Sequence, residues 1–286
     1  MAICDVCFRH CRIEEGKLGF CGARQCQEGQ VILYNYGKIT SLALDPIEKK
    51  PLYHFYPGSQ ILSVGSFGCN LHCPFCQNYE ISWSDQARRY TQKAEKISPV
   101  QLMSYAEGFK KEGSIGVAFT YNEPLIGYEY VRDTARLLRD RGMKTVLVTN
   151  GTAELPVLEE LLPLVDAMNI DLKGFTDHYY RDILKGSRTQ VMDFIQAAVK
   201  GCHVELTTLI VPGENDSEQE IRELSAWVRS LTDADGRQIG QDIPLHVSRF
   251  FPRFRMMDRG PTPVRTVYRL AEVARENLNY VYTGNC

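Results

Sequence analysis

The sequence predicts an α/β protein with a largely parallel sheet, preceded by a small cysteine-bearing lobe. From about residue 60 onward, short runs rich in Val, Ile, Leu and Thr alternate with amphipathic segments, as expected for strands covered on both faces. Residues 1–58 lack this alternation and hold closely spaced cysteines. The chain has 286 residues, enough for a sizeable buried core. We therefore expect two parts, residues 1–58 and residues 59–286.

Six predicted strands follow one another along the second part. They cover residues 61–66, 115–120, 144–149, 167–171, 204–211 and 244–249, and a seventh at 280–283 is expected to extend the sheet. Strands that alternate with helices form βα units, whose right-handed crossovers build a parallel sheet. This order predicts a complete or partial barrel, with the chemistry at the C-terminal ends of its strands.

Amphipathic helices are predicted between these strands. Apolar residues at intervals of three and four form one stripe over residues 221–231, and the pattern recurs over residues 264–278. A further helix follows Ser98 and Pro99, which supply an N-cap and a first-turn proline. Each helix is expected to pack its apolar stripe against the sheet.

Composition and charge exclude several classes of partner. The formal net charge is −2, which gives no electrostatic basis for binding nucleic acid or an anionic membrane. The N-terminal residues lack the basic and apolar runs of a signal peptide. The longest stretch without Asp, Glu, Lys or Arg, residues 51–79, is interrupted by glycines and prolines and cannot be a membrane helix. We expect a cytoplasmic protein.

Seven of the ten cysteines fall in two tight groups, Cys4/Cys7/Cys11/Cys21 and Cys69/Cys73/Cys76. In a reducing compartment, such grouping favours metal or cluster binding over disulfides. The second group directly follows the strand predicted at 61–66. A structural zinc site needs four ligands, whereas a [4Fe–4S] cluster held by three thiolates keeps one iron open. A zinc knuckle, or three thiols packed as small apolar groups, is the alternative.

The stretch CNLHCPFC resembles the CxxxCxΦC signature of the radical SAM superfamily, in which Φ is aromatic and is Phe75 here. The resemblance implies a partial (β/α)6-type radical SAM barrel with a [4Fe–4S] cluster on Cys69, Cys73 and Cys76. It also implies that the open iron chelates S-adenosylmethionine (SAM), whose reductive cleavage gives a 5′-deoxyadenosyl radical that abstracts hydrogen. The cofactors then carry the chemistry, while the protein supplies position and excludes water.

Polar residues close the other predicted strands, and several resemble the SAM-binding motifs of glycyl-radical-enzyme activases. The candidate SAM contacts are Phe75, Asn122, Glu123, Thr149, Asn150, Asp171, Lys173 and His246. Glu123 keeps the carboxylate that suits an ammonium, although the glycines of the family motif are replaced. Asp171 suits a ribose hydroxyl and Lys173 a carboxylate. The alternatives are a helix-start glutamate, a surface ion pair and a satisfied core histidine.

Over its whole length the chain resembles one subgroup related to the pyruvate formate-lyase activases, the radical SAM member of the AmmeMemoRadiSam system. The stretches DPIEKKPLYHF, TYNEP, NIDLKGF and HVSRF carry this resemblance. It implies Memo-type and AMMECR-type partners and an electron donor of the flavodoxin or ferredoxin type. Hydrogen abstraction from a small molecule or peptide is the expected reaction. A glycyl-radical-enzyme activase, or a non-catalytic iron–sulfur or zinc protein, is the alternative.

The N-terminal lobe supplies four further thiolates, from Cys4, Cys7, Cys11 and Cys21. Four thiolates suffice for structural zinc or for a second [4Fe–4S] cluster, and their spacing does not decide between these. Cys26 and His10 are possible substitute ligands. Residues 45–54, DPIEKKPLYH, join the lobe to the first strand and either line a substrate pocket or form a solvated face.

Overall fold

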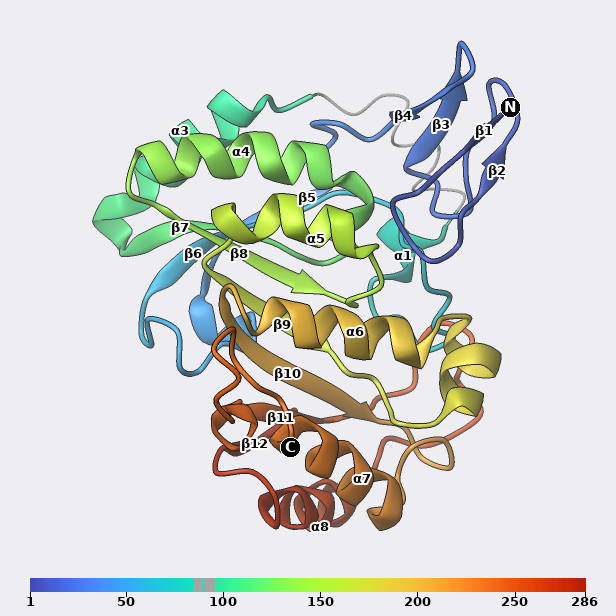
Figure 1. Cartoon of the computed structure of the whole chain (residues 1–286), viewed down its shortest axis with the longest axis vertical. Coiled ribbons are helices and arrows are strands. Elements are labelled where there is room, and N and C mark those ends of the chain that lie inside the picture. The colour runs from blue at the N-terminus through green and yellow to red at the C-terminus, as the bar shows by residue number, and fades with distance from the viewer. Residues whose placement is uncertain (85–88, 90–95) are drawn as a thin grey trace.

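The computed structural model describes residues 1–84, 89 and 96–286 (Figure 1). Eight strands of the described chain form one large sheet in the order β12-β11-β10-β9-β8-β7-β6-β5. They are β5 (Ser41–Pro46), β6 (Gln60–Gly65), β7 (Ser114–Phe119), β8 (Lys144–Thr149), β9 (Ala167–Asp171), β10 (His203–Ile210), β11 (Leu245–Arg249) and β12 (Val281–Gly284). Strands β6 to β12 pair in parallel. The predicted α/β class with a mostly parallel sheet is confirmed.

Each predicted strand is present, and its boundaries agree with the prediction to within one residue. β8 and β9 begin and end at the predicted residues, and β6 begins one residue earlier than expected. These strands are almost wholly buried, so their sequences are continuous apolar runs that stand out from the helical pattern.

The edge strand β5 differs from the expected division of the chain. It lies within residues 1–58, yet it pairs antiparallel with β6, from Ser41 opposite Gly65 to Pro46 opposite Gln60. The large sheet therefore begins inside this segment rather than after it. β5 carries exposed side chains such as Leu42, so its sequence lacks the continuous apolar run of the inner strands.

Helices cover one face of the sheet, and Figure 1 shows α4, α5 and α6 in front of β7, β8 and β9. The longer helices are α3 (Pro99–Gly108), α4 (Tyr128–Asp140), α5 (Leu155–Leu161), α6 (Arg188–Ala198), α7 (Glu218–Arg229) and α8 (Val264–Arg275). Shorter ones are α1 (Tyr79–Ser82), η1 (Ile47–Lys49), η2 (Phe109–Glu112), η3 (Pro124–Gly127), η4 (Leu162–Leu164), η6 (Gly240–Asp242) and the π-helix η5 (Tyr179–Leu184). No helix in the described ranges is both long and apolar enough to cross a membrane.

Serine caps fix the starts of three helices. The hydroxyls of Ser98, Ser187 and Ser217 each accept a hydrogen bond from the backbone N–H three residues later. Ser98 also forms a capping box with Gln101, and Pro99 occupies the first turn as predicted. Each cap contributes about 1 kcal/mol by satisfying a free helix donor.

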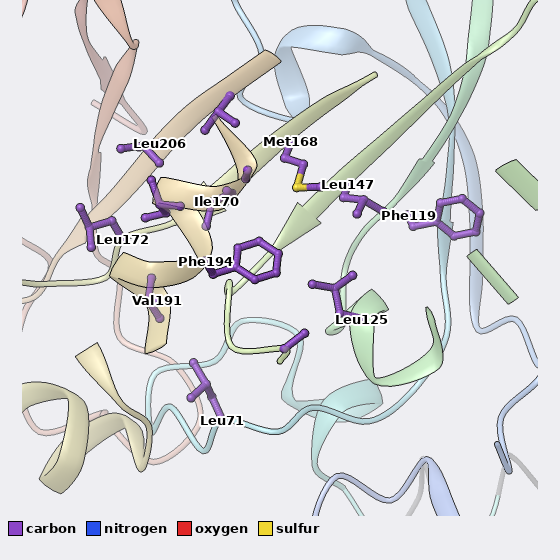
Figure 2. Packing of buried hydrophobic residues seen from close by; sticks show 14 of the residues in the cluster. Leu71, Phe119, Leu125, Leu147, Met168, Ile170, Leu172, Val191, Phe194 and Leu206 are labelled. Atoms are coloured by element: carbon purple, nitrogen blue, oxygen red, sulfur yellow. The ribbon is translucent and has the colours of Figure 1, made fainter. Parts of the chain in front are cut away.

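The main hydrophobic core lies between the sheet and these helices. Figure 2 shows Ile170 of β9 near Phe194 of α6, with Leu147 of β8 and Phe119 of β7 farther along the same cluster. All four side chains are buried. Burial of a large apolar side chain contributes roughly 1.5–3 kcal/mol, so this layer fixes the strands whose ends form the site described below.

The opposite, inner face of the sheet is covered by the segment that follows β5. Ile47, Leu52 and Phe55 from this segment pack with Ala118 and Val146 from the strands in a second buried cluster. Asn169 of β9 donates a hydrogen bond from Nδ2 to the carbonyl oxygen of Pro51 at 2.8 Å. Much of residues 45–54 is therefore packed against the sheet rather than forming a solvated face.

The N-terminal lobe consists of two small hairpins beside α1 (Figure 1). β1 (Ala2–Ile3) pairs with β2 (Arg12–Ile13), and β3 (Arg24–Gln27) pairs with β4 (Gln30–Leu33). The lobe contacts the loop after β8, where Glu154 N donates to Val6 O at 3.0 Å. Gly68 has a φ of +93° and lies so close to the carbonyl oxygen of Cys21 that a Cβ would clash. The lobe thus abuts the cysteine loop that follows β6.

Candidate functional site

The loop after β6 brings Cys69, Cys73 and Cys76 to the C-terminal end of the sheet, and none of the three forms a disulfide. The side chain of Asn122 holds the start of this loop. Its Oδ1 accepts from Ser66 N at 2.9 Å, and its Nδ2 donates to the carbonyl oxygens of Gly68 and Glu123. Both hydrogens of the Asn122 side-chain amide therefore donate to backbone carbonyl oxygens. Asn122 therefore supports the cysteine loop, and its predicted contact with SAM stays a prediction.

The three thiols fit a [4Fe–4S] cluster chemically. Burial raises the pKa of Cys69 well above its ordinary value, and the nearby Glu123 adds to this rise. Burial also raises the pKa of Cys73 to about 12, although Lys173 offsets part of the shift. Buried thiols of this kind ionise when a cation compensates their charge, as iron does.

A [4Fe–4S] cluster and a single metal ion make different demands on these thiols. Across the residues that the structure describes, no three His, Cys, Asp or Glu side chains converge closely enough to hold one metal ion. A cubane cluster spreads its ligands, because each thiolate binds a different iron. Three thiolates then leave one iron without a protein ligand from this loop.

Glu123 follows β7 and lies at the centre of a buried polar group. Its Oε1 accepts from Thr149 Oγ1 at 2.7 Å and from Leu125 N at 3.0 Å, and its Oε2 accepts from Asn150 N at 2.8 Å. Burial outweighs these hydrogen bonds and raises the pKa of Glu123 to about 7. The structure therefore brings together the predicted residues Glu123, Thr149 and Asn150, from the ends of β7 and β8.

Asn150 connects this group to the cysteine loop. Its Nδ2 lies 3.7 Å from Cys69 Sγ and donates to Asn70 Oδ1 at 2.9 Å. Asn70 in turn donates to Thr152 Oγ1 at 2.8 Å. Sequence reasoning assigned no role to Asn70 or Thr152, although Asn70 directly follows the first cysteine of the motif.

Asp171 and Lys173 lie at the end of β9, close to Cys73. Lys173 Nζ donates to Asp171 Oδ2 at 2.8 Å. Burial by itself lowers the pKa of Lys173, but the charges of Asp171 and Cys73 outweigh it and raise this pKa. Lys173 is therefore a cation at neutral pH, placed beside the thiols. Its backbone N–H donates to Tyr180 Oη at 3.0 Å, which fixes the loop.

His246 lies in a separate network on the inner face of the sheet. Its Nε2 is 2.7 Å from Oε2 of the buried Glu205, and its ring packs edge-on against Tyr53. Glu205 also accepts from the backbone N–H groups of Tyr53 and His54. One ring nitrogen of His246 is thus already engaged, and its predicted contact with SAM stays a prediction. Phe75 is buried and packs edge-on against Phe250.

The four cysteines of the lobe, Cys4, Cys7, Cys11 and Cys21, line one cavity. The two substitute ligands that we considered are not among its lining residues. Cys26 Sγ instead lies 3.4 Å from Glu15 Oε2, and His10 Nε2 lies 3.4 Å from Glu154 Oε1. The structure therefore corrects the prediction that Cys26 or His10 could complete this site.

Comparison with known proteins gives a consistent result. The sequence profile of the radical SAM superfamily matches residues 63–225. The uncharacterized protein MJ0808 of Methanocaldococcus jannaschii is 39% identical over 284 residues, covering 99% of this chain and 80% of that protein. The pyruvate formate-lyase 1-activating enzyme of Escherichia coli is 25% identical over 182 residues, covering 63% and 71% of the two chains.

Solved structures support the same fold. Streptococcus suis SuiB bound to S-adenosylmethionine superposes with a TM-score of 0.58 at 13% identity. The match covers 79% of this chain and 52% of SuiB. At this identity the likeness concerns the fold alone, which is the mostly parallel α/β sheet described above.

Proposed function

This chain belongs to the radical SAM superfamily, and we propose that it cleaves SAM reductively at a [4Fe–4S] cluster held by Cys69, Cys73 and Cys76. Members of the superfamily use this cluster together with SAM. When bound, the reduced cluster supplies the electron that splits the sulfonium into methionine and a 5′-deoxyadenosyl radical, which then abstracts hydrogen. The proposal rests on one observation. The three thiols lie beside polar side chains at the ends of β7, β8 and β9, among them Glu123 and Lys173.

Glu123 is the proposed partner of the SAM ammonium group. Thr149 and Asn150 hold its carboxylate in place, and its charge is near enough to raise the pKa of Cys69. An ammonium ion beside this carboxylate would replace a costly buried charge with a charge-assisted pair. Binding of SAM therefore favours the ionised form of Glu123.

Lys173 and Asp171 are the proposed contacts to the rest of the cofactor. Lys173 carries a positive charge beside Cys73 and suits the methionyl carboxylate. Asp171 Oδ2 accepts a hydrogen bond from Lys173, and the same carboxylate can also accept a hydrogen bond from a ribose hydroxyl. The two side chains at the end of β9 would then position the nucleoside and the amino acid on either side of the scissile bond.

Hydrogen abstraction from a small molecule or a peptide is the reaction that we propose. A second candidate is a glycyl-radical-enzyme activase, which the similarity to a pyruvate formate-lyase-activating enzyme favours. That similarity covers 63% of this chain. The lobe, which the resemblance to these activases does not include, favours the first candidate. A non-catalytic iron–sulfur or zinc protein would cleave no SAM.

The partners of the reaction follow from the same proposal. A low-potential one-electron donor of the flavodoxin or ferredoxin type is needed, because SAM cleavage consumes an electron. Memo-type and AMMECR-type proteins are the proposed partners from the resemblance to the AmmeMemoRadiSam subgroup. Binding of each purified partner by this chain, measured with and without SAM, tests that part of the proposal.

The direct test is release of 5′-deoxyadenosine. Anaerobically reconstituted protein with dithionite and SAM is expected to produce it, and protein with full iron loading but no product would contradict the proposal. Deuterated candidate substrates that transfer label into 5′-deoxyadenosine would identify the hydrogen donor. A glycyl radical that appears in a partner protein by electron paramagnetic resonance (EPR) would instead support the activase.

A further inference from the structure

The four lobe cysteines form a site distinct from the loop after β6. Cys4, Cys7 and Cys21 are 5%, 7% and 9% exposed, Cys11 is half-buried, and all four line the same cavity as free thiols. They come from two separate hairpin regions of the lobe, so folding of the lobe is needed to bring them together. Four thiols whose successive separations along the chain are 10 residues or less, and which form no disulfide, point to a metal site.

The geometry favours a cluster over zinc. Structural zinc draws four thiolates into a tight tetrahedron at Zn–S distances of about 2.3 Å. The lobe thiols instead surround a cavity whose other lining residues include the apolar Val6 and Ile13. A cluster, which takes one thiolate on each iron, fits four thiols that line one cavity.

Two arginines lie beside the thiols, and one of them is paired with a carboxylate. Arg9 and Arg24 both line the cavity. Arg24 Nε donates to Ile126 O at 2.7 Å and its Nη2 to Glu129 Oε2 at 2.6 Å, while Arg9 Nε donates to Asn70 O at 2.6 Å. Both guanidinium groups are therefore fixed in place. Four thiolates around an iron–sulfur core carry net negative charge, which fixed cations stabilise.

We propose that Cys4, Cys7, Cys11 and Cys21 bind a second [4Fe–4S] cluster, in which each iron has a protein thiolate. This inference goes beyond the proposed SAM chemistry, because a cluster with four thiolates has no open iron for SAM. It also decides the choice between cluster and zinc that the cysteine spacing leaves open.

The lobe site and the cysteine loop after β6 are connected through a single residue, Asn70. Asn70 directly follows Cys69, and its side chain faces the thiol of Cys7. Arg9, which lines the lobe cavity, binds the backbone carbonyl of the same Asn70. A reduced lobe cluster would pass one electron to the oxidised cluster on Cys69, Cys73 and Cys76 and return to its oxidised state. The initial electron comes from a low-potential one-electron donor, such as dithionite in the assay below.

Metal content tests the proposal independently of SAM cleavage. A variant with Cys69, Cys73 and Cys76 all changed to Ala has no loop site, and after anaerobic reconstitution it is expected to keep about four irons per chain. Its dithionite-reduced form is expected to give the EPR signal of a reduced [4Fe–4S] cluster. One zinc per chain, or no bound metal, in this variant would overturn the proposal. Neither result depends on whether the wild-type protein cleaves SAM.

A complementary pair of variants guards against a folding defect. Wild-type protein is expected to hold about eight irons, and Cys7→Ala combined with Cys21→Ala about four. Cys26→Ala is the matched control, because Cys26 is a fully buried lobe thiol outside the cavity, and it is expected to keep about eight. Loss of iron in Cys26→Ala equal to that in the double variant would contradict the assignment. If the double variant fails to fold, the iron content of the triple variant still decides.

The closeness of the two proposed clusters on either side of Asn70 can be tested by spectroscopy. Two reduced clusters this close are expected to interact magnetically, so the EPR spectrum of the reduced wild type should differ from the sum of the spectra of the two variants. A wild-type spectrum equal to that sum would overturn the proposed electron relay.

Discussion

Two buried glutamates, one at the strand ends and one on the inner face of the sheet, have opposite acid–base properties. Burial raises the pKa of Glu123 to about 7 despite three hydrogen bonds. Burial also opposes ionisation of Glu205, but contacts from His203, His246 and two backbone N–H groups outweigh it and lower the pKa to about 2. Glu205 is thus fully compensated by protein donors, while Glu123 is not.

The same contrast extends to the neighbouring charges. On the inner face, burial would raise the pKa of Asp45, yet hydrogen bonds from Lys50, Tyr121 and Lys49 outweigh it and lower this pKa. At the strand ends, Lys173 is paired with Asp171, whereas the pKa values of the three neighbouring thiols are raised chiefly by burial. A charge that is already compensated stabilises the fold, whereas an uncompensated one is available to a ligand. The contrast predicts loss of activity from changes at the strand ends and loss of stability from changes on the inner face.

The largest effect is expected for Cys73→Ala. Removal of one of three cluster ligands should abolish 5′-deoxyadenosine formation, a loss of at least about 1,000-fold, or more than about 4 kcal/mol. Cys202→Ala is the control, because Cys202 is a partly buried thiol whose Sγ lies 3.6 Å from the carbonyl oxygen of Ala198. Product formation by Cys73→Ala at the rate of Cys202→Ala would contradict the assignment of the loop.

The second effect concerns the inner face. Lys50→Ala leaves the buried Asp45 without its 3.0 Å partner and should lower the free energy of unfolding by about 3–5 kcal/mol. Lys49→Ala is the matched control, since Lys49 bonds the same carboxylate but its side chain is 66% exposed, and we expect a loss below about 1 kcal/mol. Urea denaturation measures both values. Equal losses would show that burial does not separate the two lysines.

The third prediction is a pH dependence of stability caused by Glu205. Because its folded pKa lies below the ordinary value of 4.5, its contribution is present above pH 4.5 and is lost as the pH falls towards 2. The full contribution is about 3 kcal/mol. Glu205→Gln should therefore be less stable at neutral pH and should lose less stability on acidification. Parallel pH profiles of the two proteins would argue against this.

The fourth and smallest effect is expected for Glu123→Gln, which removes the proposed charge for the SAM ammonium. SAM binding should weaken roughly 10- to 100-fold, the worth of a charge-assisted hydrogen bond of about 1.5–3 kcal/mol. Iron content should stay unchanged. Because the folded pKa of Glu123 lies above the ordinary value, ionisation of Glu123 lowers the stability of the protein as the pH rises from 4.5 to 7. The variant Glu123→Gln should therefore lose less stability than Glu205→Gln does.

Equilibrium dialysis with SAM and thermal unfolding at pH 8 check these two outcomes. Glu160→Gln serves as the control, since Glu160 pairs with Arg132 on the protein surface. Unchanged SAM affinity in Glu123→Gln would contradict its proposed role in binding SAM. A loss of stability as large as that of Glu205→Gln would show that Glu123 stabilises the fold instead.

Sequence reasoning located most of the strand-end site. The strands are continuous apolar runs, so their ends were placed within one residue, and parallel strands bring those ends to one edge of the sheet. Glu123, Thr149 and Asn150 could be grouped for this reason before any contact was known. The cysteine loop was located by its spacing, by Phe75 at the aromatic position and by its place after the first predicted strand.

The inner-face network could not be predicted in the same way. Glu205 binds the backbone of Tyr53 and His54, more than 150 residues earlier, and the half-exposed strand β5 gives little periodic signal. The support that Asn122 gives to the cysteine loop was missed for a related reason, because the backbone atoms that its side chain binds belong to a loop more than 50 residues away. A side chain that binds distant backbone atoms cannot be recognised from the sequence, because almost every residue type offers the same backbone groups.

Electron–nuclear double resonance of the reduced protein with isotope-labelled SAM tests the central claim most directly. The triple variant Cys4/Cys7/Cys21→Ala, with iron on the loop alone, avoids overlap with a second cluster. Coupling between the cluster and ¹⁵N in the SAM amino group, or ¹⁷O in its carboxylate, is the result that our account predicts. A reduced cluster with no such coupling at saturating SAM, and with a protein side chain on its fourth iron, would contradict it.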